Sequence, residues 1–151
     1  MDQFTHRVEK ALQEAQNLAL AGQHSEMRPL HLLSAFSSLD ESLLVEVCDQ
    51  LGALPQVRER LRDAIAQVPT LGTASNDLRM SSELARVLAV ARTLAEKAGD
   101  RFVPEEWVLV GLLQDTELRQ LLKPLGITPE LIEATAEKHR QGDKVLEKHD
   151  E

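Results

Sequence analysis

The sequence contains little cysteine and no long apolar run, and each absence excludes a class of protein. Its one cysteine, Cys48, allows neither an internal disulfide nor a cysteine-liganded zinc site. No apolar run approaches the roughly 18 residues that a membrane-spanning helix needs. The run Met1–Arg7 lacks the basic and apolar regions of a signal peptide. These absences predict a cytoplasmic protein.

Positive charge and aromatic residues are also scarce, whereas helix-forming residues are abundant. The chain has 17 Lys and Arg against 25 Asp and Glu, a net charge of −8. Because nucleic-acid affinity depends largely on cations that neutralise phosphates, DNA and RNA are poor candidate partners. The 151 residues include 26 Leu and 16 Ala, while aromatic residues make up 3%. This balance predicts an all-α protein of one domain, or of two very small ones.

Glycine and proline divide the chain into eight predicted helices. Thr5 is the expected N-cap of the first, because its hydroxyl can accept a hydrogen bond from a free backbone N–H group. Gly22 ends this helix, since glycine accepts the left-handed conformation that often follows a helix. The other predicted helices run from Leu30 to about Ser37, from Asp40-Glu41-Ser42 to Gly52, from Pro55 to the long loop Pro69–Asp77, from Ser81 to Gly99, from Pro104 to Leu113, from Thr116 or Asp115 to Gly126 and from Thr128 to about His139.

An internal repeat relates the two halves of the chain. When the sequence is shifted so that position 31 lies over position 107, His31 aligns with Trp107. At the same shift, the leucine and alanine positions on either side of His31 align with leucine and alanine positions of the second half. Farther along, the second half is two residues shorter than the first, and with the shift reduced by two residues Gly52 aligns with Gly126. The shared order of glycine and proline indicates a duplication.

The repeat predicts the domain organisation. Two four-helix repeats, about residues 4–68 and 79–140, would cover each other's apolar faces and form one pseudo-symmetric globular domain over residues 1–141. Residues 142–151 carry mixed charges and little to bury, so we expect a linker or a disordered tail there.

Motifs for catalysis or metal binding are absent from the sequence. There is no phosphate-binding glycine loop, no nucleophile elbow and no paired-histidine metal motif. His24 and His31 are expected to be ordinary surface or partly buried histidines, and Cys48 a small buried apolar residue. Helix-dipole pairing and solvation account for Glu105 and Glu106 at a helix start. We therefore expect no enzyme, catalytic residue, metal or cofactor in this chain.

Two apolar residues suggest a binding surface. Val90 falls on the polar row of its predicted helix, and Trp107 lies on a helix that is apolar nearly all round. A short connection joins these two helices, so Val90, Leu94 and Trp107 could share one surface. Trp suits such a surface because it buries a large area at a low entropy cost. The alternative is that Trp107 belongs to the core.

Several segments resemble the N-terminal domain of Clp ATPases. The resemblance covers about residues 3–146. It is closest to the ClpB type, the protein disaggregase, because the Thr-Glu-His run usual in the ClpC type is missing from both repeats. The segments that carry it are Phe4-Thr5-x-x-Val8-x-x-Ala11-Leu12-x-x-Ala15-Gln16-x-Leu18-Ala19, Met27-x-Pro29-Leu30-His31-Leu32-Leu33-x-Ala35, Ser81-x-x-Leu84-x-Arg86-Val87-Leu88, Leu94-Ala95-x-Lys97-x-Gly99-Asp100-x-Phe102-Val103-x-x-Glu106 and Arg140-Gln141-Gly142-x-x-Val145.

The resemblance implies a substrate-recognition module. Such a domain sits on a linker before two AAA+ ATPase domains of a hexameric chaperone, captures unfolded or aggregated polypeptide in a shallow apolar groove and passes it to the ATPase pore. Family positions linked to substrate handling fall on Thr5, Asp100 and Glu106. The carboxylates of Asp100 and Glu106 would form an acidic rim that favours basic segments. Those linked to the apolar groove fall on Val90, Leu94 and Trp107, although the family pattern has Leu in place of Val90 and Trp107.

Other interpretations stay open at this point. Thr5 could act only as a helix cap and Asp100 only as a brace for the turn. The domain could dock adaptor proteins of a Clp protease unfoldase, or it could be a stand-alone relative. In each case we expect no nucleic-acid or membrane partner, and a monomeric isolated domain.

Overall fold

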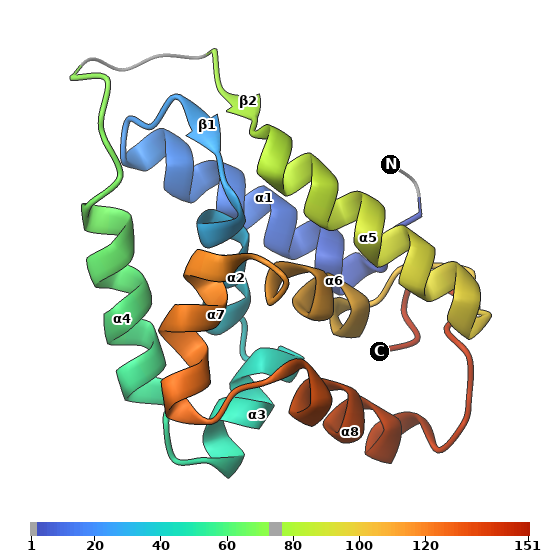
Figure 1. Ribbon diagram of the computed structural model, residues 1–151. Coiled ribbons are helices and arrows are strands. Elements are labelled where there is room, and N and C mark those ends of the chain that lie inside the picture. Colours follow the sequence, from blue (N-terminus) through green and yellow to red (C-terminus); the bar gives the residue numbers. More distant parts are fainter. Residues whose placement is uncertain (1–2, 73–76) are drawn as a thin grey trace.

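The computed structural model describes residues 3–72 and 77–151, and helices dominate these segments (Figure 1). The predicted all-α class with eight helices is confirmed. The predicted loop Pro69–Asp77 includes residues 73–76, which lie outside the described residues. The elements are α1 His6–Ala21, β1 Glu26–Met27, α2 Pro29–Ser38, α3 Leu43–Gln50, α4 Leu54–Ala66, β2 Arg79–Met80, α5 Ser82–Ala98, α6 Glu105–Leu112, α7 Thr116–Leu122, the short 3-10 helix Lys123–Leu125 and α8 Pro129–Arg140.

Side-chain caps mark the starts of several helices, as the sequence predicts. Ser81 Oγ accepts from the N–H group of Leu84 at 3.0 Å at the start of α5. Thr128 Oγ1 accepts from that of Leu131 at 3.2 Å at the start of α8. Thr5 is the N-cap of α1. Each cap satisfies a backbone donor that has no partner within its helix.

The end of α1 differs from the prediction. Gly22 has a right-handed φ of −82°, and the left-handed conformation falls on Gln23, with a φ of 58°. Glycine is needed at position 22 for a different reason, because a Cβ atom there would lie 2.6 Å from Cε1 of His24. The prediction was therefore right about where the helix ends and wrong about what the glycine does.

Two short backbone ladders demonstrate the pseudo-symmetry. Met27 of β1 pairs with Met80 of β2 in parallel, and an isolated parallel bridge joins Phe4 to Val103. At the repeat offset Met80 corresponds to Phe4, and at the same offset Val103 corresponds to Met27. The Phe4–Val103 bridge is thus equivalent to the Met27–Met80 pairing, except that each residue is replaced by its counterpart from the other repeat. This exchange confirms the predicted arrangement of two related halves in one domain.

The central helices of the two repeats form the middle of one core. In α2 every residue from Pro29 to Ser37 is buried, and in α6 Val108 to Leu112 are buried. α1 packs on α2 and α5 packs on α6, and α2 also contacts both α5 and α6. Because α6 has partners on several sides, its sequence is apolar nearly all round.

The C-terminal segment lies against the domain. Val145 is fully buried, and its carbonyl accepts from the N–H group of Arg101 at 2.6 Å. Farther along, the carbonyl of Lys148 accepts from the N–H group of His6 at 2.9 Å, at the start of α1. The segment that the sequence suggests is a linker or disordered tail therefore reaches the first helix of the domain. Within the described residues, no helix combines the length and apolarity required to cross a membrane.

Candidate binding site

Val90 and Leu94 lie one turn apart on α5, where Leu94 also packs against the core. Both are half-buried, and they line one shallow depression of about 380 Å³. Two basic side chains, Arg86 and Lys97, complete its border with Ala89 and Thr93. This surface combines accessible aliphatic groups with a basic edge.

Trp107 lies in a different place from the one its sequence suggests. It is half-buried, packs against the core, and lines a second depression of about 510 Å³ together with Glu106. Its indole Nε1 donates a hydrogen bond to Asp100 Oδ2 at 2.8 Å. The structure thus places Val90 and Leu94 in one depression and Trp107 and Glu106 in another.

Arg140 holds the two predicted acidic site residues. Its Nη1 atom lies 3.1 Å from both carboxylate oxygens of Asp100, and its Nη2 donates to Glu106 Oε1. Asp100 is 8% exposed and Glu106 is 4% exposed. Burial raises the pKa of Glu106 to about 7, and the positive charge of Arg140 opposes that rise. The predicted acidic rim is therefore wrong, because both carboxylates are buried and paired.

Thr5 and Asp100 both have the structural roles that the sequence left open. Thr5 Oγ1 accepts from the N–H group of Val8 at 3.4 Å as a helix cap. Asp100 Oδ1 accepts from the N–H group of Val145 at 2.8 Å and so holds the C-terminal segment against the turn after α5. A part in substrate handling stays a prediction for both residues.

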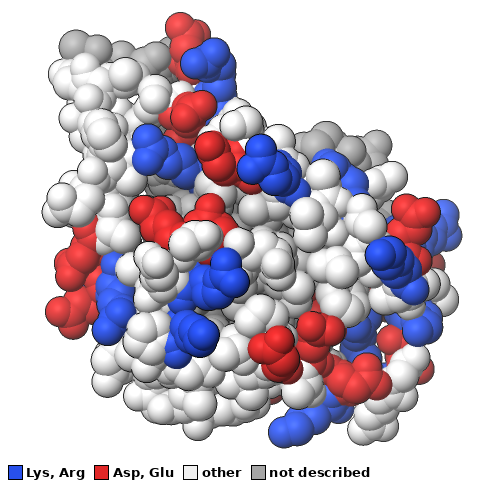
Figure 2. Space-filling view, in the orientation of Figure 1, with Lys and Arg blue, Asp and Glu red and all other residues white. Residues whose placement is uncertain are grey.

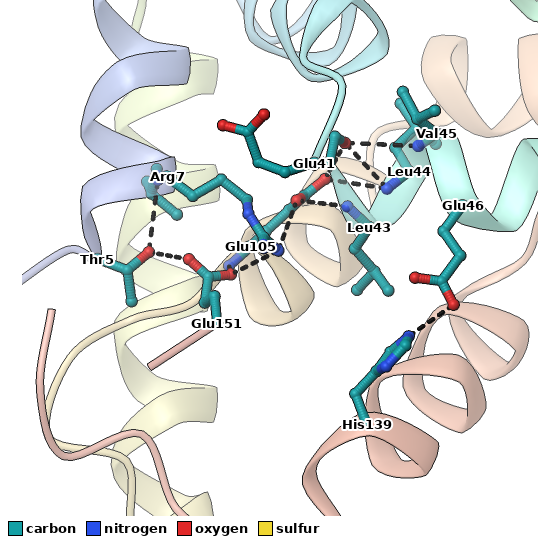
Figure 3. A network of polar contacts seen from close by, with 12 residues as sticks. Thr5, Arg7, Glu41, Leu43, Leu44, Val45, Glu46, Glu105, His139 and Glu151 are labelled. Atoms are coloured by element: carbon teal, nitrogen blue, oxygen red, sulfur yellow. Dashed lines mark hydrogen bonds and ion pairs between the residues drawn. The ribbon is translucent and has the colours of Figure 1, made fainter. Parts of the chain in front are cut away.

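Glu105 is a structural residue whose role the sequence did not reveal (Figure 3). Its side chain is fully buried, so the solvation predicted for it is wrong. It accepts hydrogen bonds at the start of α3 in the other repeat, from Ser42 Oγ at 2.6 Å and from the N–H groups of Leu43 and Leu44 at 2.7 and 3.0 Å. Burial raises the pKa of Glu105 to about 7 although these donors oppose the rise. A glutamate after a proline indicates a helix start, but nothing in the sequence identifies its partner in the other repeat.

Arg7 and Glu151 complete the polar cluster and were also missed. Figure 3 shows Thr5, Arg7 and Glu105 gathered around Glu151. Arg7 Nη1 lies 3.5 Å from Glu105 Oε1 and 3.5 Å from Glu151 Oε2. The cluster joins the start of α1, the start of α6 and the C-terminal segment. Charged residues are so common in this sequence that neither had a distinguishing signal.

His24 and His31 form a buried pair that the sequence did not predict. They are 5% and 0% exposed, and His24 Nδ1 lies 2.8 Å from His31 Nε2. The N–H group of Arg28 donates to His31 Nδ1 at 2.8 Å. His31 Nδ1 must therefore be unprotonated, so Nε2 carries the proton and donates to His24. Burial lowers the pKa of His31 to about 4, which keeps the ring neutral.

The histidine pair and the Asp100–Trp107 pair occupy equivalent positions in the two repeats. At the repeat offset Asp100 corresponds to His24, and Trp107 corresponds to His31. Both pairs are joined by a side-chain hydrogen bond of 2.8 Å. The first is closed inside the protein, whereas the second includes a half-buried indole. The two equivalent pairs thus share a side-chain hydrogen bond of the same length, but the residues that form it are two histidines in one repeat and a tryptophan and an aspartate in the other.

Metal-binding and reactive groups do not assemble into a site within residues 3–72 and 77–151. No cluster of three or more His, Cys, Asp or Glu side chains suits a metal ion there. Cys48 is buried as predicted, and burial raises its pKa to about 12. On the face drawn in Figure 2, basic and acidic side chains are interspersed. That face offers no continuous basic surface for a nucleic acid.

Comparison with known proteins confirms the resemblance expected from the sequence. The family profile described as Clp repeat (R) N-terminal domain matches residues 3–125. The chain is 30% identical over 145 residues to the chaperone protein ClpB of Brucella suis biovar 1 (strain 1330), which covers 94% of this chain and 17% of that protein. It is 29% identical over 147 residues to ClpB of Vibrio cholerae serotype O1, which covers 96% of this chain and 17% of that protein. The chain therefore spans about 17% of the length of the curated relatives it matches.

Solved structures show the same fold. The N-terminal domain of Hsp104 from Candida albicans superimposes with a TM-score of 0.85 at 21% identity, over 97% of both chains. A ClpV N-domain in complex with a VipB peptide superimposes with a TM-score of 0.71 at 19% identity, over 90% of this chain and 86% of that chain. At these identities the likeness establishes the fold.

Proposed function

Since the chain belongs to the Clp repeat N-terminal domain family, a class of substrate- or adaptor-binding module, we propose that it recognises substrates for a ClpB-like disaggregase chaperone. It binds unfolded or aggregated polypeptide on the Val90–Leu94 depression and passes it to the ATPase domains of a larger protein. A cytoplasmic location, a monomeric isolated domain and a hexameric parent protein are parts of this proposal. No catalytic step is assigned to the chain.

The observation that carries the proposal is the partly exposed aliphatic depression on α5. α5 is anchored on its other face by fully or nearly fully buried residues, so the outer face is presented on a rigid support. Fully burying an exposed aliphatic side chain contributes about 1.5–3 kcal/mol, and Val90 and Leu94, which are already half-buried, can each contribute about half of that. Together they give less than the about 4 kcal/mol that corresponds to a Kd of 1 mM, so the depression alone supports only weak binding. Weak contacts of this kind suit a domain that must release its load, and several copies on one ring would raise the effective affinity.

The border of the depression suggests which segments it prefers. Arg86 and Lys97 flank the aliphatic floor, whereas Asp100 and Glu106 are neutralised elsewhere. Apolar segments with acidic neighbours therefore match this surface better than the basic segments expected from the sequence.

A titration of the chain with a permanently unfolded protein, reduced and carboxymethylated α-lactalbumin, tests the proposal. Amide NMR signals of α5 around Val90 and Leu94 are expected to shift in a saturable way. Val90→Ser should weaken binding about fivefold, since it removes about 1 kcal/mol of apolar contact. Leu20→Ser on α1, which removes an exposed apolar side chain elsewhere, is the matched control and should leave binding unchanged. Shifts confined to other helices, or equal effects of the two variants, would contradict the α5 assignment.

A second candidate function is docking of an adaptor or other folded partner. The observation that favours it is the ClpV N-domain solved with a VipB peptide, a fold relative in complex with one defined peptide. Under this alternative the unfolded probe gives no saturable shift, whereas one partner forms a stoichiometric complex. The unfolded-protein titration therefore separates the two functions.

A further inference from the structure

A carboxylate lies in a cradle of three donor groups between the starts of α1 and α6 (Figure 3). Thr5 Oγ1 donates to Glu151 Oε1, and the N–H group of Glu105 donates to Glu151 Oε2 at 2.7 Å. Arg7 Nη1 lies 3.5 Å from the same Oε2 atom. The Glu151 side chain is 9% exposed and that of Arg7 is 18% exposed. Both carboxylate oxygens are thus bound by donors in a largely buried site.

The domain itself holds these donors in place. The N–H group of Thr5 is bonded to the carbonyl of Val103 at 3.1 Å, which fixes the start of α1 beside the start of α6. Glu105 is the first residue of α6, so its N–H group has no partner within the helix. The side chain of Glu105 is held by the start of α3, so it leaves this N–H group accessible. The positive ends of two helix dipoles also meet here.

The equivalent position in the other repeat lacks both the arginine side chain and the backbone N–H group of the cradle. Under the repeat alignment, Ser81 replaces Thr5, Glu83 replaces Arg7 and Pro29 replaces Glu105. Proline has no N–H group to donate, and Glu83 has the wrong charge for a carboxylate. The depression at that position is lined by Glu26, Glu83, Asp115 and Glu117 beside Arg28, Pro29 and Leu30. The cradle is therefore a property of these three residues and does not follow from the fold.

We propose that Thr5, Arg7 and the N–H group of Glu105 form a carboxylate-binding subsite, which Glu151 fills from within the chain and which an acidic side chain of a bound polypeptide fills when the C-terminal segment moves away. The exchange of occupants rests on the proposed function, whereas the subsite itself does not.

Two further features support an exchange of occupants. A cavity of about 360 Å³ adjoins the cradle and is lined by Arg7, Glu106, Arg140 and Glu151 among others, so a second chain has space to approach. Burial raises the pKa of Glu151, while Arg7 and the hydrogen bonds from Thr5 and Glu105 oppose the rise. Desolvation therefore offsets part of what the donors contribute to holding the internal carboxylate.

Emptying the cradle tests the subsite. Glu151→Ala removes the internal carboxylate, and Glu147→Ala removes an exposed one from the same segment as the matched control. Sodium acetate is titrated into each variant at constant ionic strength, with sodium chloride as the reference salt, while the amide NMR signals of Thr5 and Glu105 are followed. Acetate should bind the Glu151→Ala chain at least about tenfold more tightly than the Glu147→Ala chain, because a tethered Glu151 that fills the cradle about nine-tenths of the time leaves only about a tenth of the control chains free to bind acetate. Equal acetate affinities in the two variants, or identical shifts with chloride, would overturn the subsite.

A pair of short peptides tests the requirement of the exchange that an acidic side chain of a second chain can occupy the emptied cradle. One carries a single Glu between Gly and Ser residues and the other carries Gln at that position. In the Glu151→Ala chain the Glu peptide should shift the Glu105 amide at concentrations where the Gln peptide does not, and adding Arg7→Met should abolish the difference. Indistinguishable peptides would overturn the exchange even if acetate binds. The α5 titration is independent of both measurements, so its failure would remove the proposed function and leave the subsite intact.

Discussion

Replacing Gly22 by alanine should destabilise the protein through the ring of His24. With a φ of −82°, position 22 suits any residue, and a Gly→Ala change in such a conformation normally stabilises a protein by about 0.4–1 kcal/mol. Here the added Cβ would lie 2.6 Å from Cε1 and 2.8 Å from Nε2 of His24. The ring must move, and the Nε2 proton of His31 then has no acceptor. A buried donor left unpaired costs about 1–3 kcal/mol.

The expected net effect of Gly22→Ala is a loss of about 1–2 kcal/mol, or roughly 4 °C in Tm for a protein of this size. Urea unfolding followed by circular dichroism and by the fluorescence of Trp107 measures it. The second repeat supports the reasoning, because Ala98 occupies the equivalent position where Asp100 replaces His24. In a His24→Ala background, Gly22→Ala should therefore become neutral or stabilising, a coupling of about 2 kcal/mol.

Gly52→Ala is the control for this cycle. Its φ of 63° makes a side chain unfavourable, but no heavy atom lies within 4 Å of the added Cβ. It should cost about 1–2 kcal/mol with or without His24, because a Cβ atom is unfavourable in the left-handed conformation. If Gly22→Ala is as stable as the parent protein while His24 is present, the steric argument is refuted.

Three further predictions concern buried ionisable groups. Because burial lowers the pKa of His31 from 6.5 to about 4, the unfolded chain binds a proton that the folded chain does not, so the contribution of His31 to stability should fall by up to about 3 kcal/mol between pH 6.5 and pH 4. The raised pKa values of Glu105 and Glu106 act in the opposite direction, so the test is the difference in unfolding free energy between the parent protein and His31→Asn in urea titrations, and a difference that does not change with pH would contradict the prediction. Arg140→Met should destabilise by about 3 kcal/mol by leaving Asp100 and Glu106 buried without their cation, whereas Lys138→Met on the exposed side of α8 should have little effect on the urea midpoint. Cys48 should resist alkylation by iodoacetamide in buffer and react once urea unfolds the chain, because burial raises its pKa to about 12; rapid labelling of the folded chain would disprove this.

The helices and the duplication were predictable because their signals are local. Caps such as Ser81 and Thr128, together with the left-handed glycines Gly99 and Gly126, act within a few residues of where they stand. The repeat could be found because its glycine and proline positions recur in order. The two-residue strands were not predicted, since a pairing of that length leaves no periodic pattern.

The contacts that build the polar clusters were unpredictable because they join distant parts of the chain. Glu105 is held at the start of α3, and the sequence offers no sign of which helix start it would reach. The sequence left open whether Trp107 belongs to a binding surface or to the core, and it gave no sign of the hydrogen bond to Asp100. Its separation from the Val90–Leu94 depression depends on how α6 packs on α5, which helical periodicity does not determine.

The exchanged ladders Phe4–Val103 and Met27–Met80 have a consequence for the origin of the domain. A contact that recurs with its partners swapped is the mark of an isologous interface, the kind found between the subunits of a twofold-symmetric homodimer. The domain is therefore organised as a symmetric dimer joined into one polypeptide. Joining removes the obligation of the two copies to stay identical, so one copy keeps Thr5 and Arg7 around a carboxylate while the other carries Ser81 and Glu83 at the matching positions.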